Sequence, residues 1–530
     1  MNRRLLLRWA GWFALVNSVV FGVVSLRYFS GGVPAPSFLS LIYLVSVYIG
    51  HHVLLTTVPL LLVATPLIIL FPGRRVVTVA AVVLFASMIA LMMLDSLLWS
   101  QSRFHLNALT MKILGWQSWF FAAVIFAVGL FFQSMLARAV WAWVEAPKKR
   151  HGRLLGVICT FLILTSQMIH AWADAAYYVP VTGLGQVLPV YKGVTAKKLL
   201  QRTGLVDVQE SRERELARRM SRSLDESSGR LLNYPRSPLN CSAEQPMNLL
   251  FIVVDSMRGS MLTDEYAPNI SAFAAQYAIT YRNHFSGGNS SRMGMFSLFY
   301  GLPPAYWASF SSLQRSAVLL DEMQARDYQL GLFSSSTLYR PVVLDRTAFA
   351  NVPDLRIVTE PASDPSWKRD RKLTGEWFDW LDGRDEQKPF FGFLFYDAAM
   401  SVSPPPDYEK QWAPADDSEQ QQDYSRYRSA VHFVDGLAGQ VLDDLAQRNL
   451  LENTVVVITS DHGEEFGESS AKLERHGSGY TRHQLVIPLV LAWPGRQQGV
   501  ELDHRTSHYD IVPTLMQDLF ACSNPPQDYS

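Results

Sequence analysis

Long apolar runs fill the first third of the chain. Five of them reach the roughly 20 residues that a helix needs to cross about 30 Å of hydrocarbon. These runs cover residues 9–29, 38–71, 76–99, 118–143 and 153–172. The second run contains Pro59 and Pro66, but no polar turn divides it, so we count it as one tilted or kinked span. The pattern predicts an N-terminal bundle of five transmembrane helices.

The hydrophobic pattern changes to short runs from about residue 247. Five β-rich runs alternate with helical stretches: NLLFIVVD, YQLGLFSSS, FFGFLFYD, TVVVITSD and IPLVLAWPG. Continuous apolar strands of this kind are buried on both faces, which is typical of a mainly parallel sheet covered by helices. We therefore expect a transmembrane domain at 1–178, an interfacial segment and linker at 179–246, and an α/β domain at 247–530.

Composition and charge place this chain in a membrane and orient it. The 530 residues are 49% hydrophobic and only 18% charged, which is too apolar for an ordinary soluble protein. Short cytoplasmic loops carry an excess of basic residues. Such residues precede the first run, follow the second and separate the fourth from the fifth: Arg3, Arg4, Arg8, Arg74, Arg75, Lys148, Lys149, Arg150 and Arg153. We therefore expect a cytoplasmic N-terminus and an outer location for everything after about residue 178.

The linker is dense in charge, and two interpretations of it stay open. Its arginines either form a solvated helix face or bind acidic lipid head groups, since the guanidinium fork matches phosphate. The lipid-binding candidates are Arg218, Arg219, Arg222, Arg230 and Arg236. Cys241 and Cys522 both fall in the outer region, where they either pair or remain separate thiols.

Two of the predicted strands end in an acid. Asp255 closes LLFIVVD, and Asp461 closes VVVITSD and is followed by His462. Chemistry gathers at the carboxyl ends of parallel strands, and a carboxylate beside an imidazole is ligand chemistry for Zn²⁺ or Mn²⁺. A lone aspartate at this place is also compatible with a turn or a helix N-cap.

A Gly-Gly loop adds a possible nucleophile. The segment FSGGNSSRMGMFSLFYG, residues 285–301, leads Ser290 and Ser291 into a predicted helix, whose first turn favours an anion. A serine there that is coordinated to a divalent cation can lose its proton and attack phosphorus. The alternative is a simple serine N-cap.

The order of these motifs resembles the alkaline phosphatase/sulfatase superfamily, over about residues 247–517. It is most similar to the membrane-anchored branch that holds phosphoethanolamine transferases and lipoteichoic acid synthases. The later motifs that carry the resemblance are SDHGEEFGE, RHGSGYTRHQLVIPLVLAWPG and SHYDIVPTLM. The resemblance implies a divalent metal ion, Zn, Mn or Mg, and a catalytic pair in which Ser291 is the nucleophile and His476 contacts the substrate or leaving group. The implied metal ligands are Asp255, Ser291, Asp461 and His462; Ser291 is preferred to Ser290 because it stands ten residues before Gly301.

The whole chain, membrane part included, resembles the YejM (PbgA, LapC) family of Gram-negative inner-membrane proteins. The resemblance is carried by GWFALVNSVVFGVVSLRYF, DSLLWSQSRFHLNALTMKI, HAWADAAYYVPVTGLGQVLPVYKGVTAKKLLQRTGL and FSGGNSSRMGMFSLFYGLPPAYW. It implies a sensor of lipopolysaccharide or lipid A that controls lipopolysaccharide synthesis through the LapB adaptor and proteolysis of LpxC. It also implies a role with cardiolipin, and it places Arg236, in NYPRSP, at the lipid-contacting junction.

Three departures from these patterns limit the activity. Ser291 is followed by Arg-Met-Gly-Met, which lacks the Pro or Ala that formylglycine sulfatases need, so that class is excluded. The segment FLFYDAAMSVSPPPDY lacks the histidines that hold phosphate in the transferases, so Arg292 or His476 would have to replace them. The chain also ends with SNPPQDYS, earlier than superfamily members do, and we expect a C-terminally truncated domain.

Two functions follow. The favoured hypothesis is a lipid-binding signalling protein with a retained metal site, and the alternative is a metal-dependent phosphatase or phosphoethanolamine-type transferase acting on phospholipid or lipid A. Ser291→Ala is expected to be silent under the first and inactivating under the second. A transporter is disfavoured, because His51 and His52 in the second run are better explained as interfacial or hydrogen-bonded between helices than as a proton path.

Overall fold

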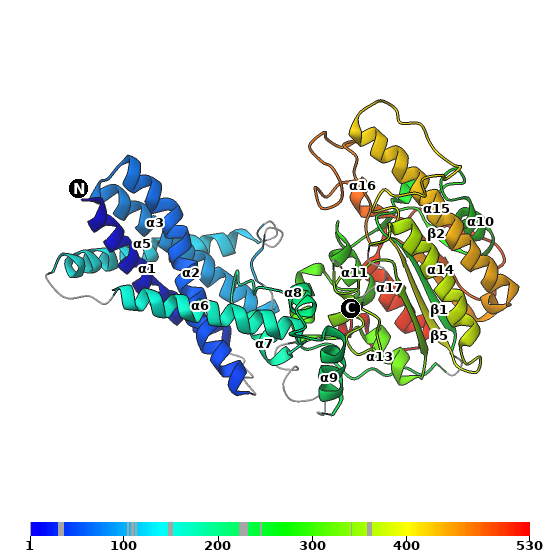
Figure 1. Cartoon of the computed structure of the whole chain (residues 1–530), viewed down its shortest axis with the longest axis horizontal. Helices are drawn as coiled ribbons and strands as arrows, with labels where there is room; N and C mark the ends of the chain where they lie inside the picture. The colour runs from blue at the N-terminus through cyan, green and yellow to red at the C-terminus, as the bar shows by residue number, and fades with distance from the viewer. Residues whose placement is uncertain are drawn as a thin grey trace. The chain divides into compact units, whose positions relative to one another are not determined.

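The computed structural model describes residues 2–29, 37–102, 105–107, 111, 114–146, 152–221, 232–243, 246–340, 342–357 and 363–530 (Figure 1). The chain divides into two compact units, Met1–Leu232 and Asn233–Ser530. Their boundary falls inside the expected linker at 179–246. We call them the membrane unit and the external domain and describe each by itself.

Within the described residues, the membrane unit contains five helices that are long and apolar enough to cross a membrane, as predicted. They are α1 (Arg3–Ser25), α2 (Phe38–Leu70), α3 (Arg74–Ser102), α5 (Trp116–Glu145) and α6 (Gly152–Ala175). The α2 helix runs unbroken through Pro59 and Pro66, so the undivided second span is confirmed. Proline is tolerated there because neighbouring helices can satisfy the backbone groups that it frees.

Aromatic stacking and buried polar pairs hold these helices together. Trp9 of α1 stacks on Trp141 of α5 with ring centroids 4.9 Å apart. Asn17 accepts a hydrogen bond of 2.6 Å from Gln133, which again joins α1 to α5. Large apolar side chains on the outer faces, such as Phe131 and Met168, are exposed, as expected where lipid would cover them.

The membrane unit continues into α7 (Val179–Gly185), α8 (Lys197–Arg202) and α9 (Val208–Ser221). The segment after α7 is bonded to membrane helix residues through histidines. His51 Nε2 lies 2.9 Å from the carbonyl oxygen of Pro189, and His170 Nδ1 lies 2.9 Å from that of Val194. His52 Nδ1 lies 2.6 Å from the carbonyl oxygen of Tyr48, so both histidines of the second span are hydrogen-bonded, His52 within its own helix and not between helices.

The external domain is built on a seven-stranded sheet in the order β4-β5-β1-β6-β8-β2-β9. All five predicted strands are present: β1 (Asn248–Val254), β4 (Gln329–Ser334), β5 (Phe390–Tyr396), β6 (Thr454–Thr459) and β8 (Leu489–Ala492). The first four are parallel, and β8 runs antiparallel to β6. Every residue of β1, β5 and β6 is buried, which explains their continuous apolar sequences.

Five shorter strands complete the domain. The sheet ends with β2 (Ile279–Tyr281) and β9 (Val500–Leu502), and β10 (Thr506–Ser507), β3 (His284–Phe285) and β7 (Val486–Ile487) form a second, small sheet.

Helices cover both faces of the large sheet, as predicted. Leu250, Ile252 and Val254 of β1 belong to one core cluster with residues of α10 (Pro268–Tyr277), α14 (Ser366–Gly383) and α15 (Glu419–Gln447). The intervening Phe251 faces the other side, where its ring lies 5.9 Å from Phe299. That side carries α11 (Ser291–Tyr300), α13 (Val318–Ala325) and α17 (His508–Thr514) (Figure 1). Two short helices, α12 (Trp307–Leu313) and α16 (Arg482–Leu485), lie in the connections.

A disulfide joins Cys241 to Cys522, two cysteines whose pairing remained open from the sequence. The two residues also form an isolated antiparallel bridge. The crosslink ties the segment before β1 to the segment after α17, so every strand of the domain lies inside one covalent loop. Cys159, in the membrane unit, is a free thiol.

Candidate metal centre

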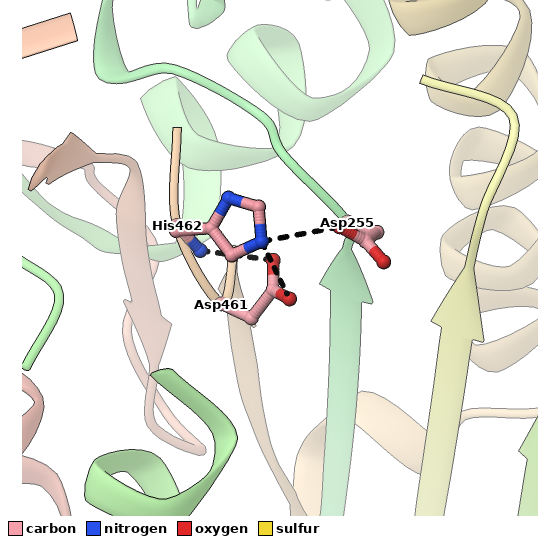
Figure 2. A group of neighbouring side chains, drawn as sticks. All are labelled: Asp255, Asp461 and His462. Atoms are coloured by element: carbon pink, nitrogen blue, oxygen red, sulfur yellow. Dashed lines mark hydrogen bonds and ion pairs between the residues drawn. The ribbon is translucent and has the colours of Figure 1, made fainter. Parts of the chain in front are cut away.

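The candidate metal centre lies where neighbouring strands β1 and β6 end (Figure 2). Val253 of β1 is paired with Thr459 of β6, so Asp255 and Asp461 leave the same edge of the sheet two residues later. Asp255 also donates its backbone N–H to the carbonyl oxygen of Tyr396 on β5, at 2.9 Å. The parallel register therefore brings together two acids that are 206 residues apart in the chain.

The three side chains drawn in Figure 2 converge and are fully buried. His462 Nε2 lies 3.6 Å from Asp255 Oδ1 and 3.4 Å from Asp461 Oδ2. One potential ligand atom from each residue falls within 4.8 Å of the others. These residues can therefore hold a metal ion together.

The orientation of His462 is set by its own turn. Its Nδ1 lies 2.9 Å from the carbonyl oxygen of Gly463 and donates to it. The lone pair is thereby left on Nε2, the nitrogen that faces the two acids, as in many metal sites where a backbone carbonyl fixes the tautomer.

Ser291 reaches the same place from the first turn of α11. Its Oγ lies 3.1 Å from His462 Nε2. This approach requires a glycine on α11, because a Cβ on Gly294 would lie 1.8 Å from the carbonyl oxygen of Asp461. The structure thus brings together all four residues of the expected ligand set, and their roles remain predictions.

Two carboxylate oxygens of the centre have no hydrogen-bond partner. Asp255 Oδ2 and Asp461 Oδ2 are buried and accept no hydrogen bond, whereas Asp461 Oδ1 accepts from the backbone N–H groups of Ser256 and His462. Burial raises the pKa of Asp255 well above its ordinary value, and the charges of Asp461, Asp397 and Glu464 raise it further. Buried carboxylates in this state are costly unless a cation compensates them. Two carboxylates, one imidazole and one hydroxyl suit Zn²⁺, Mn²⁺ or Mg²⁺.

His476 lies beside the centre. Its ring centroid is 4.6 Å from that of His462, and its Nδ1 is 3.1 Å from Glu464 Oε2. Burial lowers the pKa of His476, but the hydrogen bond and charge of Glu464 outweigh burial and raise it overall. A partly exposed imidazole with a raised pKa next to the centre suits the contact with substrate or leaving group expected from the sequence.

Sequence reasoning missed Glu464 and two further residues that support the centre. Asp397 follows β5 beside Asp255 and pairs with Arg369 at 2.7 Å. It also closes an apolar run, FFGFLFYD, so the signal that identified Asp255 was present for it as well. His508, in the SHYDIVPTLM motif, lies 3.0 Å from the carbonyl oxygen of Ser460 and 3.1 Å from Ser297 Oγ of α11. Burial lowers the pKa of His508 to about 4, so it joins α17 to the centre as a neutral ring.

A second group of potential ligands is already occupied by protein partners. Glu465, Glu468 and His483 also fall within 4.8 Å of one another. However, Glu468 forms an ion pair of 2.7 Å with Arg258, and Glu465 accepts from the backbone N–H of Ser469 at 2.9 Å. The first group is therefore the better candidate for binding a metal ion.

The expected lipid-binding arginines are only partly described. Arg218, on α9, binds Glu215 through Nε and Nη2 at 2.7 and 2.6 Å and lies over the ring of Tyr178. Arg219 is its neighbour on α9, and Arg236 is an exposed residue of the external domain. Arg222 and Arg230 lie outside the described residues.

Comparisons with known proteins cover both units. Residues 1–241 match a domain of unknown function, DUF3413, and residues 247–519 match the Sulfatase family. The chain is 28% identical over 544 residues to the inner membrane protein YejM of Salmonella typhimurium, covering 98% of this chain and 85% of that protein. It is 27% identical over 546 residues to an uncharacterized protein of Haemophilus influenzae, covering 98% and 84%.

Among solved structures, the soluble domain of lipooligosaccharide phosphoethanolamine transferase A from Neisseria meningitidis matches with a TM-score of 0.43 and 18% identity, covering 55% of this chain and 92% of that one. The family match and the observed sheet agree on an α/β domain of the sulfatase type. The chain is similar over 98% of its length to the inner membrane protein YejM, and its five apolar helices precede a sulfatase-like domain. The chain therefore belongs to the Sulfatase family.

Proposed function

We propose that this protein senses lipopolysaccharide or lipid A in the inner membrane and regulates lipopolysaccharide synthesis and outer-membrane lipid homeostasis. The observation that carries the proposal is that similarity to YejM runs through 98% of the chain, membrane helices included. With a cytoplasmic N-terminus, the membrane unit presents its short basic loops to a LapB-type adaptor that controls proteolysis of LpxC. Cardiolipin, another acidic lipid, is a second expected ligand.

Arginines of the linker supply the recognition chemistry in this proposal. Arg218 is oriented by Glu215, and Arg236 is held at its backbone by a hydrogen bond of 2.7 Å from its N–H to the carbonyl oxygen of Asp528. Guanidinium groups of residues held by such contacts suit the phosphates of lipid A, because hydrogen bonds between charged groups are stronger than those between neutral groups.

The test measures binding of lipid A to the full-length protein in nanodiscs, together with LpxC abundance in cells. Arg236→Ala should weaken binding about tenfold, the loss of one charge-assisted hydrogen bond. Arg426→Ala is the matched control, because Arg426 is an exposed arginine whose partner is Asp423. Equal binding by the two variants, with LpxC unchanged in both, would contradict the assignment.

We also propose that the external domain retains one divalent cation, bound by Asp255, Ser291, Asp461 and His462. The two unpaired carboxylate oxygens support this. Elemental analysis of the purified protein should give about one equivalent of metal, lost in Asp461→Ala/His462→Ala. The chain offers a matched control in Asp503 and His504, an adjacent and exposed Asp-His pair. Metal retained by the first variant would refute the ligand set.

A second function is favoured by the position of Ser291. Its Oγ is 3.1 Å from His462 Nε2 at the start of a helix, which suits a metal-dependent phosphatase or phosphoethanolamine-type transferase acting on phospholipid or lipid A. A bound cation would lower the pKa of the Ser291 hydroxyl. Ser291 Oγ would then attack phosphorus, while His476, charged through Glu464, would donate a proton to the leaving oxygen.

Turnover of a phosphodiester lipid analogue tests this second function. Ser291→Ala should reduce turnover at least about 1000-fold while metal content stays near one equivalent. Ser290→Ala is the control, because the Ser290 side chain makes no capping hydrogen bond. If wild-type protein with its metal shows no turnover, or if both variants retain it, the enzymatic hypothesis fails and the sensor hypothesis stands.

A further inference from the structure

The last part of the linker, residues 233–243, lies in the external domain, and we call it the docked segment. Tyr234 is its one buried side chain, 8% exposed. The Tyr234 hydroxyl accepts from the backbone N–H of Val318 at 3.3 Å, and its carbonyl oxygen accepts from Arg315 Nε at 2.9 Å. Tyr234 therefore fixes the start of the segment at a defined place.

That place is the C-terminal half of α11. The ring centroid of Tyr234 lies 5.7 Å from that of Tyr300, the last residue of α11, and 4.9 Å from that of Phe310 on α12. Phe310 also lies 5.3 Å from Phe296, which stands one turn before Tyr300 on α11. Buried aromatic pairs of this kind stabilise by more than the area that they bury. The docked segment therefore helps to hold α11 in its position.

The N-terminal half of the same helix forms one side of the candidate metal centre. Ser291 is the first residue of α11, and its Oγ lies 3.1 Å from His462 Nε2. Gly294 packs so closely on the turn after β6 that a Cβ there would lie 1.8 Å from the carbonyl oxygen of Asp461. A helix of ten residues spans about 15 Å, and close packing at both ends transmits a displacement along it. The helix therefore connects Tyr234 with the candidate metal ligands.

We propose that α11 couples docking of this segment to cation binding, with Tyr234 as the positioning residue at the far end of the helix. Without the Tyr234 ring, a cavity opens beside Tyr300, and α11 relaxes toward it. Ser291 then leaves the place that it shares with His462. In the opposite direction, a bound cation fixes Ser291 and thereby the surface on which Tyr234 packs. Coupling between two sites is reciprocal, so each event strengthens the other by the same factor.

This inference rests on the proposed metal centre and adds a means of regulating it. Arg236, a candidate for lipid binding, lies two residues after Tyr234 in the docked segment. The backbone N–H of Arg236 donates to the carbonyl oxygen of Asp528 at 2.7 Å. A ligand that draws Arg236 away from the external domain would pull on Tyr234 as well and would lower the affinity of the centre for its cation. Conversely, a loaded centre would hold the docked segment in place.

The experiment titrates Mn²⁺ into metal-free, full-length protein in nanodiscs and measures the free ion by electron paramagnetic resonance. Tyr234→Ala should weaken Mn²⁺ binding about tenfold, a loss typical of residues that support metal ligands from outside the coordination shell. Tyr234→Phe keeps the ring and should restore most of the affinity. Saturating Mn²⁺ should also slow amide hydrogen exchange of the docked segment in the wild-type protein, by about the same factor.

The matched control is Tyr328→Ala. Tyr328 is 6% exposed, and its hydroxyl donates to the carbonyl oxygen of Met247 at 2.7 Å. It lies directly before β4, at the edge of the sheet opposite the candidate metal centre. Its truncation should lower the melting temperature, as Tyr234→Ala does, but should leave Mn²⁺ affinity unchanged.

The outcomes separate the coupling from the metal centre on which it rests. If the wild-type protein binds Mn²⁺ and Tyr234→Ala binds it as tightly, or if Tyr328→Ala loses as much affinity, the coupling is refuted and the metal centre stands. Exchange of the docked segment that does not change with Mn²⁺ would also refute the coupling. If the wild-type protein binds no Mn²⁺, the metal centre is refuted, and the coupling with it.

Discussion

A buried aspartate of the membrane unit, Asp95, and the two aspartates of the candidate metal centre differ in how their oxygens are bonded. In the membrane unit, Asp95 of α3 has both oxygens bonded: Oδ2 accepts from Tyr28 at 2.7 Å and from His105 at 2.8 Å, and Oδ1 accepts from the backbone N–H of Leu106. In the external domain, Asp255 and Asp461 each keep one buried oxygen without a partner.

The difference separates a structural carboxylate from one prepared for a ligand. A fully bonded acid such as Asp95 contributes to stability through the donors that it satisfies. A pair of half-bonded acids is a net cost to the folded protein until a cation arrives. We therefore expect the stabilities of the two units to respond differently to substitution of these aspartates and to metal chelation.

The largest loss of stability is expected from a substitution that displaces α11 from the candidate metal centre and leaves its acidic residues in place. Gly294→Ala should destabilise the external domain by about 4 kcal/mol, since the new Cβ would lie 1.8 Å from the carbonyl oxygen of Asp461. Gly436→Ala on α15 meets nothing within 4 Å and should instead be stabilising by up to about 1 kcal/mol. Thermal unfolding of both variants checks this; equal melting temperatures would mean that α11 does not pack as described.

Removing the fully bonded acid comes next. Asp95→Ala leaves the donors of Tyr28, His105 and Leu106 unpaired and should cost about 3 kcal/mol, with no dependence on metal. Melting of the full-length protein in detergent, with and without chelator, measures it. Ser87→Ala serves as the control, because Ser87 is bonded only to Val83 of its own helix. If the loss of stability in Asp95→Ala depended on chelator, Asp95 would not differ from the aspartates of the candidate metal centre.

Removal of metal by a chelator tests directly how the aspartates of the candidate metal centre differ from Asp95. At free metal 100 times its Kd, binding stabilises the wild-type external domain by about 2.7 kcal/mol, which a chelator should abolish. Asp461→Asn should not respond to chelator. It should also melt above the chelated wild-type protein, because it removes one uncompensated charge. A variant that melts below chelated wild type would argue that Asp461 is structural, like Asp95.

The smallest loss of stability is expected for Glu468, an acidic residue of the external domain that forms an ion pair with Arg258. Burial raises the pKa of Glu468, but the ion pair with Arg258 outweighs it and lowers the pKa to about 2 from an ordinary 4.5. Its contribution is therefore complete above about pH 4.5 and is lost as the pH falls toward 2. Glu468→Gln should cost about 2 kcal/mol at pH 7 and less than about half of that at pH 3.

The control for that prediction is Glu501→Gln, because Glu501 pairs with Arg282 but is largely exposed. It should change stability by less than about 1 kcal/mol at either pH. If the Glu468 and Glu501 variants lose the same amount at pH 7, burial is not what strengthens the Arg258 pair.

The fold was predictable wherever burial is continuous. The spans and the five main strands follow from long or unbroken apolar runs, and each appears in the structure. The strands of two or three residues, such as β3 and β7, carry no periodic signal, because pairing across the chain creates them. The disulfide was likewise undecided, since only the fold brings Cys241 beside Cys522.

The residues of the candidate metal centre that lie at strand ends or in short sequence motifs could be predicted from the sequence. Strand ends and the Asp-His motif identify Asp255, Asp461 and His462, whereas Ser291 was preferred to Ser290 only through the family resemblance. The structure brings the four residues together. Glu464 and His508 were not identified as supporting residues, because their contacts are made between side chains and turns distant in sequence. The unpaired state of the two carboxylate oxygens is a property of packing alone.

The parallel pairing of the central strands also determines at which stage of export the residues of the candidate metal centre come together. Asn248 of β1 pairs with Thr454 of β6, and Val254 pairs with Tyr396 of β5. As the chain emerges into the periplasm, β1 must wait for more than a hundred further residues before either neighbour arrives, and such distant pairings form slowly. The candidate ligands therefore come together only after Asp461 and His462 have been delivered, so a cation bound there would be taken from the periplasm and not from the cytoplasm where the chain is made.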